Sequence, residues 1–240
     1  MKNKLLAILM LFICSYAMVS CQKIKGDGPI VKEERQVTEF SRISASLDGT
    51  NYVTQEGERK LTIEAQQNIL DVIETRVVDG RLSIYFKNGK RIGRHDPIVV
   101  RISTPVINDL DLQGSSDMLV TNDINTNELK LNISGSGEMK LKQVQVTQGL
   151  YANISGSGNI LALGGTAAYG NFSVSGSGSI NLLPVIIPKV EAHIGGSGNI
   201  RTTATNQLDV HISGSGNLWY GGNPVLSTHI SGSGNVRKNQ

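Results

Sequence analysis

Apolar and polar residues alternate along the second half of the chain, in runs that end at short segments rich in serine and glycine. In residues 150–154, for example, Leu, Ala and Ile alternate with Tyr and Asn. Successive side chains of a β-strand point to opposite faces, so this alternation predicts strands with one buried face. The side chains predicted to face inward before these segments are Leu129, Leu131, Leu150, Ala152, Gly170, Phe172, Val190, Ala192, Leu208, Val210, Leu226 and Thr228.

The Ser-Gly segments form a repeat of the type I-S-G-S-G-N-I. Its copies begin at residues 112, 133, 154, 174, 194, 212 and 230, so the period is 18–21 residues. A period near 20 residues is typical of one solenoid coil and is too short for a helix pair or a propeller blade. A second short strand is predicted after each segment, with Met139, Leu141, Ile160, Ala162, Ile180 and Leu182 facing inward.

Two folds fit this repeat, a parallel stack of coils and an antiparallel meander with Gly-Ser-Gly-Asn hairpin turns. Neighbouring hairpins do not need identical sequences, whereas stacked coils bring equivalent residues together about every 4.8 Å. Serine and asparagine ladders would then satisfy polar groups at the corners. Glycine allows backbone angles closed to other residues, and Asn tolerates left-handed geometry. We therefore predict an all-β fold with a parallel β-helix, or solenoid, over residues 112–236.

The preceding residues, 37–111, are rich in strand patterns but carry no repeat. Strands are predicted at 60–64, 81–86 and 98–102, separated by Gly and Asp turns. One short helix is predicted over residues 68–75, with Asn68 as its N-cap and Ile69, Leu70, Val72 and Ile73 on its apolar side. This part is predicted to form a β-rich lead-in to the solenoid.

The N-terminus has the layout of an export signal over residues 1–20. Lys2 and Lys4 precede an apolar run from Leu5 to Val19 that is short for a membrane span. Residues 18–21 (Met-Val-Ser-Cys) resemble a bacterial lipobox, so we expect Cys21 to carry a lipid and residues 21–36 to form a tether. We expect the chain to lie in the bacterial cell envelope, at the outer membrane, with the membrane as a partner through this lipid.

Loss of the signal removes Lys2 and Lys4 and no acidic residue, so the formal charge falls from +3 to +1. The mature chain therefore offers no electrostatic case for binding nucleic acid. No cysteine follows Cys21 in the sequence, so disulfides cannot stabilise the fold.

The repeat, the lipobox and the strand-rich lead-in together resemble the head GIN domain family of autotransporter adhesins. Gly-Asn-Ile at 158–160 and 198–200 is the tripeptide after which the family is named, with relaxed copies at 216–218 and 234–236. The resemblance covers about residues 37–236. It implies a β-helix-like architecture and a binding or adhesion module, and it brings no catalytic residues and no cofactor. A glycan or a surface protein is the expected partner.

Parallel β-helices also include polysaccharide lyases and hydrolases, which remain the alternative function. Such chemistry needs acidic or basic groups that converge on a cleft. The acidic residues that we expect near the start of the repeats are Asp109, Asp111, Asp117, Asp123, Glu128 and Glu138. Their simpler interpretation is a solvated acidic rim, and no Ser-His-Asp spacing stands out, so we predict a binding module rather than an enzyme.

A basic loop is the first candidate binding element. It consists of Lys87, Lys90, Arg91, Arg94 and His95 around two glycines. A flexible solvated loop is the simpler interpretation. The alternative is contact with an anionic surface, which a tether at Cys21 would bring close. Tyr151, Trp219 and Tyr220 are candidate aromatics for stacking on sugars, although they are scattered along the sequence.

A histidine column is the second candidate. His193, His211 and His229 each directly precede a repeat, so in-register coils would place them in one outward-facing column. Glu191 and Asp209 lie two residues upstream on the same face. Imidazoles and carboxylates are ligands for transition metals such as zinc, although an exposed ladder lacks the supporting contacts that hold metal ligands. The column is therefore a candidate metal site, with repeat drift as the simpler explanation.

The repeat also bears on self-association. A parallel stack ends in an unpaired strand edge, and terminal repeats are normally capped. Only four residues follow the copy at 230–236, so we expect end-to-end association.

Overall fold

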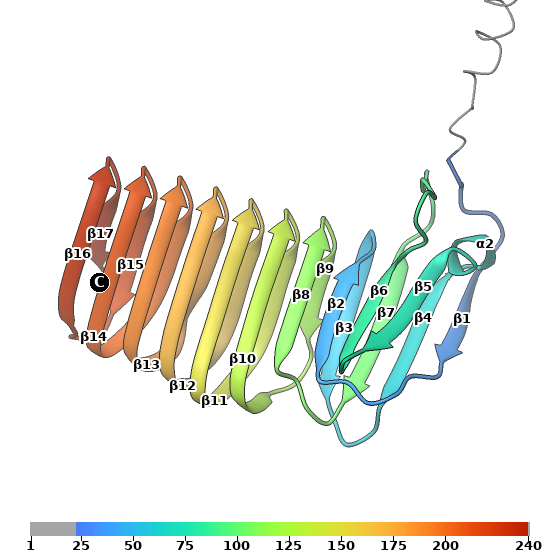
Figure 1. Cartoon of the computed structure of the whole chain (residues 1–240), viewed down its shortest axis with the longest axis horizontal. Helices are drawn as coiled ribbons and strands as arrows, with labels where there is room; N and C mark the ends of the chain where they lie inside the picture. The colour runs from blue at the N-terminus through green and yellow to red at the C-terminus, as the bar shows by residue number, and fades with distance from the viewer. Residues whose placement is uncertain (1–22, 240) are drawn as a thin grey trace, which may run out of the picture.

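The computed structural model describes residues 23–239, and these form a parallel β-solenoid with a mixed β-structure at its N-terminal end (Figure 1). Its elements are β1 (Ile30–Arg35), β2 (Arg42–Ser46), β3 (Gly49–Gln55), β4 (Lys60–Gln66), α2 (Gln67–Leu70), β5 (Ile73–Val78), β6 (Arg81–Phe86), β7 (Ile98–Thr104), β8 (Asp109–Gly114), β9 (Asp117–Val120), β10 (Ile124–Gly135), β11 (Glu138–Gly156), β12 (Asn159–Gly176), β13 (Ser179–Gly196), β14 (Asn199–Gly214), β15 (Asn217–Gly221), β16 (Val225–Gly232) and β17 (Asn235–Lys238).

The repeat coils stack in parallel, as the period predicts. The long strands β10 to β14 each bend around the solenoid, and every neighbouring pair among them is parallel. Equivalent residues of the repeat lie in register, so that Ile133 pairs with Ile154, which pairs with Val174. The antiparallel meander is therefore excluded for these coils.

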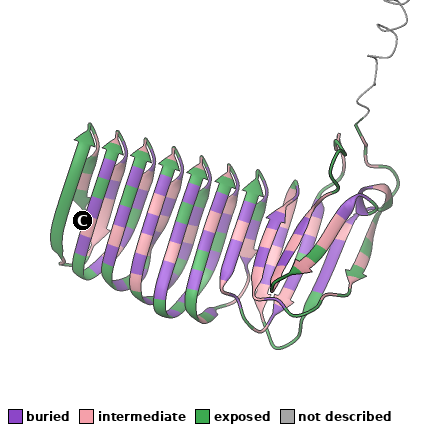
Figure 2. Ribbon diagram, viewed as in Figure 1, coloured by how far each residue is buried: buried purple, intermediate pink, exposed green. Residues whose placement is uncertain are grey.

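Burial follows the predicted alternation. Figure 2 shows buried and non-buried residues alternating along the repeat strands. Leu129, Leu150, Phe172 and Val210 are each fully buried, and so are their predicted partners on the inward face through β14. The inward residues after each segment, such as Met139 and Ile180, are also buried. The inward and outward positions predicted from the alternation in the sequence are confirmed.

The last coil departs from this pattern. Leu226 and Thr228 occupy inward columns, opposite Leu208 and Val210, but both are exposed because no described coil covers them. All of β16 is exposed, as Figure 2 shows. The outer edge of β16 and β17 pairs with no strand among residues 23–239, and end-to-end association through it stays a prediction.

The N-terminal part continues the stack instead of forming a separate unit. Strands β2 and β3 pair in parallel with β8 and β9 on one side and with β6 and β7 on the other. Beyond them, β4, β5 and β1 add antiparallel pairings. Strand β8 spans residues 109–114, so the stack crosses the boundary placed at 111/112 without a break. The three strands predicted in this part are confirmed as β4, β6 and β7.

The predicted helix at 68–75 is wrong in length and in its cap. Helix α2 covers only Gln67–Leu70, and its N-cap position is Gln66, which makes no side-chain capping bond. The Asn68 side chain instead binds backbone atoms of Lys25 and Asp27. Ile73 begins β5, because its side chain packs into the core from a strand that pairs with β6.

At the corners, glycine is required by geometry, as Gly176 illustrates. Its φ of +130° lies in a region that L-residues avoid, and a Cβ there would collide with the carbonyl oxygen of Gly156 in the preceding coil. The expected left-handed asparagines are not found: among the described residues, Asp79 alone has a positive φ outside glycine. Asn199, Asn217 and Asn235 form the predicted ladder instead, with amide hydrogen bonds of 3.4 and 3.3 Å.

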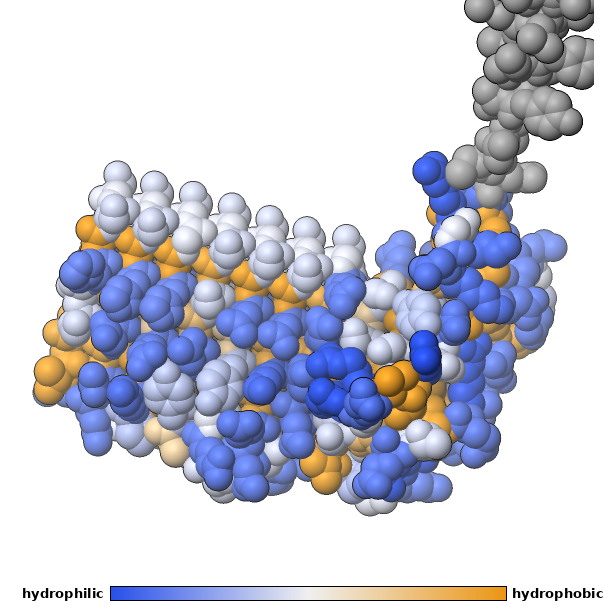
Figure 3. Space-filling model, in the orientation of Figure 1, coloured by the Kyte–Doolittle hydropathy of each residue, from blue (hydrophilic) through white to orange (hydrophobic). Residues whose placement is uncertain are grey.

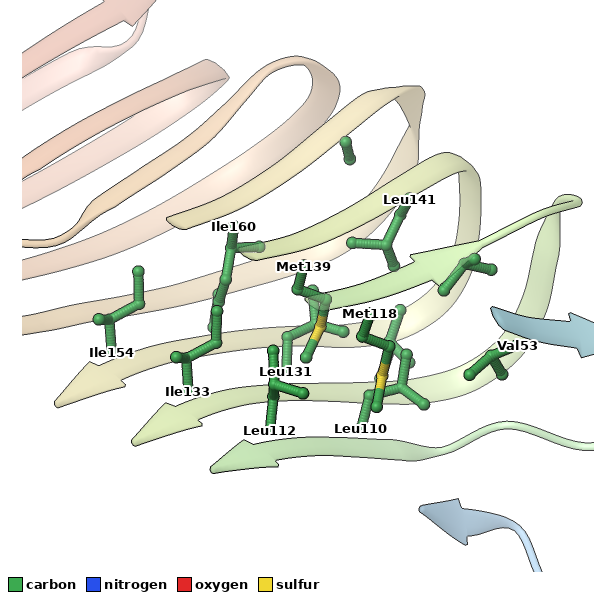
Figure 4. Close-up of a cluster of buried hydrophobic side chains, with 14 of the residues drawn as sticks. Val53, Leu110, Leu112, Met118, Leu131, Ile133, Met139, Leu141, Ile154 and Ile160 are labelled. Atoms are coloured by element: carbon green, nitrogen blue, oxygen red, sulfur yellow. The ribbon is translucent and has the colours of Figure 1, made fainter. Parts of the chain in front are cut away.

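One hydrophobic core runs through the stack. Figure 4 shows Leu112, Ile133 and Ile154 in successive coils, with Met118 beside Met139 and Val53 of β3 in the same cluster. Within residues 23–239, no helix is long and apolar enough to cross a membrane.

Candidate ligand-binding face

Three columns of outward side chains cover the strand segments that lead into the repeats. Parallel register places Asn132, Asn153, Ser173, His193, His211 and His229 in one column. A second column, two residues upstream, runs through Lys130, Tyr151, Asn171, Glu191, Asp209 and Ser227. The third column, two residues downstream, consists of Ser134, Ser155, Ser175, Gly195, Ser213 and Ser231. We call this surface the column face.

The three histidines form the predicted column. The rings of His193 and His211 are stacked, with centroids 5.0 Å apart and planes at 10°. The rings of His211 and His229 are 5.8 Å apart and tilted by 32°. Nε2 of His211 lies 3.5 Å from an Asp209 carboxylate oxygen, so this acid faces the column as expected.

The stacked rings are not arranged as a metal site. A zinc ion needs ring nitrogens that converge at about 2.0–2.1 Å, and nitrogens lie in the ring planes. Nearly parallel rings 5.0 Å apart point their nitrogens side by side instead of at a common centre. Among the described residues, no group of three His, Cys, Asp or Glu side chains could hold a metal ion. Zinc binding by the column stays a prediction that requires the imidazoles to turn.

A shallow groove runs beside the histidine column. Its volume is about 440 Å³, within the range of small-molecule sites. Imidazoles of all three histidines line it, together with serine hydroxyls and the apolar Val174, Ile194 and Ile212. Figure 3 shows apolar residues as a continuous band beneath the row of serines and glycines along the edge of the solenoid. Val174, Ile194 and Ile212 are only 0–2% exposed, so the side-chain groups that the groove offers to a ligand are imidazoles and hydroxyls.

Gly195 is the groove residue that the sequence argument missed. Other copies of the repeat from 133 onward carry serine at this position, and Gly195 pairs with Ser175 and Ser213. A Cβ at Gly195 would meet only one atom, at 4.0 Å, so neither space nor backbone geometry requires glycine. In the sequence, this position could have been found as the glycine that replaces serine in the copy I-G-G-S-G-N-I.

The predicted acidic cluster is only partly assembled. Arg81 holds Asp109 at 2.7 Å and Asp111 at 3.7 Å, near the start of the repeats. Asp117 instead accepts a hydrogen bond from the backbone of Glu138. A cleft of about 580 Å³ nearby is lined by charged Arg42, Asp109, Glu128 and Lys130, among others. The paired carboxylates of Asp109 and Asp111 thus make a structural ion pair with Arg81.

The basic loop is tied to the segment that follows Cys21. Ile24 forms a parallel bridge with Ile92, and its backbone exchanges hydrogen bonds with Arg91 and Gly93 at 2.8 and 2.7 Å. The cationic side chains of this surface, which we call the basic loop surface, are exposed: Lys23, Lys25, Lys87, Lys90, Arg91 and Arg94. Cys21 itself lies outside the described residues.

The three candidate aromatics do not come together. Tyr151 lies on the column face, where its ring contacts Tyr169 edge-on at 6.2 Å between centroids. Trp219 lies on a strand segment after the repeat, beneath the guanidinium of Arg201, and Tyr220 packs against the core. They form no shared platform for a sugar.

The chain is similar to one known protein family and to several solved structures. The family model described as "Putative auto-transporter adhesin, head GIN domain" matches residues 39–224. No curated protein matches the chain.

Three solved structures are similar over nearly the whole chain. A "putative adhesin" from Bacteroides fragilis is 27% identical with a TM-score of 0.83, covering 90% of this chain and 100% of that one. A "putative lipid binding protein" from Parabacteroides distasonis is 26% identical with a TM-score of 0.70, covering 91% and 100%. A "putative adhesin" from the same species, 23% identical with a TM-score of 0.73 and covering 91% and 100%, shares the fold.

Proposed function

The chain belongs to the head GIN domain family of auto-transporter adhesins, and we propose that it is an adhesion module that binds its ligand on the column face. The family points to a protein of the cell surface or envelope. The ligand class that we propose is an extended surface polymer, a glycan or a surface protein.

The observation that carries this proposal is the register of the column face. Outward side chains lie in straight columns with one residue from each coil, so the surface presents polar groups at a regular spacing along one direction. An extended ligand laid along the columns meets several weak contacts at once. Contacts of that kind add through their effective concentration, which suits adhesion to a polymer.

We further propose that the chain is held at the membrane by a lipid on Cys21 and oriented by the basic loop surface. The lipid supplies the membrane affinity, and a polybasic patch supplies a further attraction of about 1 kcal/mol per Lys or Arg near an anionic surface. Hydrogen bonds between Ile24 and the 91–93 segment keep this surface within a few residues of the anchor. The column face would then project away from the membrane on a rigid rod.

The test of adhesion uses the Cys21→Ser chain, purified without lipid, on printed oligosaccharides and on immobilised surface proteins. His211→Ala, on the column face, should weaken binding by several-fold. Arg201→Ala is the matched control, because Arg201 lies on the strand segment behind that face. Failure of the chain to bind any probe on either support, or equal loss in both variants, contradicts the proposal.

Anchoring is tested separately in cells. Cys21→Ser should move the protein from the membrane fraction to the soluble fraction. Lys90→Gln combined with Arg91→Gln should leave the lipid in place and increase the protein's release at low salt, because high salt already screens these charges in the native chain. A Cys21→Ser protein that still sediments with membranes after a salt wash contradicts lipid anchoring.

A further inference from the structure

The groove beside the histidine column is lined by a restricted set of chemical groups. Its lining contains no carboxylate, ammonium or guanidinium group. Anionic ligands need cationic or oriented amide partners, and cationic ligands need carboxylates. Serine hydroxyls both donate and accept hydrogen bonds, and imidazole nitrogens add further polar partners, so the groove matches an uncharged ligand that also donates and accepts. A polyhydroxyl compound has that property.

One imidazole in the groove has a free aromatic face. His193 stacks on His211 with one face, and its other face looks toward Ser173, the residue in register in the preceding coil. No aromatic ring among residues 23–239 stacks on that second face. Because serine is small, the space above Ser173 is open for a flat group of ring size.

The same place is widened by Gly195. This position pairs with Ser175 and Ser213, and a serine there would fill the groove beside His193. Glycine lowers the stability of a strand interior through entropy, by about 0.5–1 kcal/mol relative to alanine. No contact or backbone angle at Gly195 compensates for that cost. The vacant volume lies two residues along the strand from His193, in the same coil and opposite Ser175 of the preceding coil.

We propose that this groove binds one sugar ring of a glycan, stacked on His193 above Ser173, with a ring substituent in the space that Gly195 leaves in the coil of His193. The ring carbons contact the free face of the His193 imidazole. The ring hydroxyls exchange hydrogen bonds with the hydroxyls of Ser173 and Ser175. The proposal rests on the adhesion function and names the ligand class of the column face, with the glycan chain continuing along the columns.

The test begins with a printed array of neutral oligosaccharides that end in galactose, fucose, mannose or N-acetylglucosamine. The Cys21→Ser chain is applied, and the best-bound oligosaccharide is then titrated by calorimetry. Gly195→Ser should weaken binding by about tenfold or more, because it fills the site with the side chain that neighbouring coils carry. His193→Ala should weaken binding about three- to tenfold, the effect of losing one stacking contact.

Two controls lie off the column face. Lys140 and Arg201 are exposed, and the parallel register places them in one column on the strand segment behind that face. Lys140→Ala and Arg201→Ala should each change affinity less than twofold. Far-ultraviolet circular dichroism of each variant checks that the solenoid is intact.

The outcomes distinguish this proposal from the adhesion function. Glycan binding that Gly195→Ser and His193→Ala do not alter overturns the sugar site and leaves adhesion standing. Binding to immobilised protein with no oligosaccharide bound also overturns the sugar site alone. Absence of binding to every probe overturns both.

Discussion

The repeat coils and the N-terminal part share one core, yet different contacts hold them. In the coils from β10 to β14, each strand pairs in parallel with the next, and the same glycine corner recurs in every coil. In the N-terminal part, antiparallel pairs meet parallel ones, and single side chains bridge segments far apart in sequence. Arg35, for example, donates to the carbonyl oxygens of Ile73 and Leu70 at 2.9 and 3.1 Å.

This difference implies two kinds of sensitivity to mutation. A repeat coil contacts only its two neighbours, so its stability is a sum of like interfaces. A change that pushes one coil away from its neighbours therefore weakens the stack at the interfaces of that coil. The stability of the N-terminal part depends on individual contacts. Removing one of them should therefore destabilise the region around that contact.

The largest effect is expected for Phe172→Ala. Phe172 is fully buried between Ala152 and Ala192 in the neighbouring coils, and its ring covers Gly170. The rigid stack cannot close over the cavity, so the free energy of unfolding should fall by about 3–5 kcal/mol. Urea denaturation followed by circular dichroism measures it.

A double variant sharpens this prediction. A Cβ at Gly170 would lie 2.7 Å from the Phe172 ring, so Gly170→Ala alone should destabilise the protein. In the Phe172→Ala background the same methyl group partly fills the cavity, and it should restore stability. Additive losses in the double variant would show that the ring does not occupy the space over Gly170.

The repeats determine how much of the fold and of the column face could be predicted from the sequence. Parity placed Phe172 in the core, and the period placed His193 beside His211, because both follow from register alone. The N-terminal part has no period, so its strands were found but their partners were not. Helix α2 was overextended because Ile73 fits an apolar helix face as well as a strand, and only pairing with β6 decides between them. Ring orientation in the histidine column, which decides metal binding, has no sequence signal.

The second-largest loss of stability is expected for a glycine of the repeat coils, and a glycine of the N-terminal part serves as its comparison. Gly176→Ala meets a positive φ of +130° and a carbonyl oxygen of the coil below, whereas Gly80→Ala meets a φ of +71° and open space. The cost should be about 3 kcal/mol or more for Gly176, and about 1–2 kcal/mol for Gly80, where backbone strain acts alone. Thermal and urea unfolding of both variants measure the difference between the two losses in the free energy of unfolding. Equal losses would mean that the neighbouring coil yields to an added methyl group.

The third effect concerns the junction between the regions. Arg81→Met leaves Asp109, which is 7% exposed, without its cation, and the Asn132 amide at 3.3 Å is its remaining side-chain partner. We expect a loss of about 2 kcal/mol, the scale of a hydrogen bond to a charged group. Arg81→Met combined with Asp109→Asn should recover part of it. A single variant as stable as the native chain would show that the ion pair is not needed at this junction.

The smallest effect is a pH dependence within the repeat coils. Partial burial between neighbouring coils raises the pKa of Tyr169 above its usual value of about 10, and the nearby Glu191 carboxylate acts in the same direction. The Asn171 amide donates to the phenol oxygen at 3.3 Å and opposes the shift, because it favours the phenolate. Desolvation is the larger influence, so the folded state holds the phenol proton more tightly than the unfolded chain.

The sign of the stability change follows from proton binding. Between the unfolded pKa, about 10, and the higher folded pKa, the unfolded state has lost its proton and the folded state has kept it. The Tyr169 contribution to stability is therefore fully present below pH 10 and is lost as the pH rises through the folded pKa. The free energy of unfolding should decline over that window, and less steeply in Tyr169→Phe. Glu191→Gln should lower the Tyr169 pKa in an ultraviolet titration, and an unchanged pKa would show that burial alone sets it.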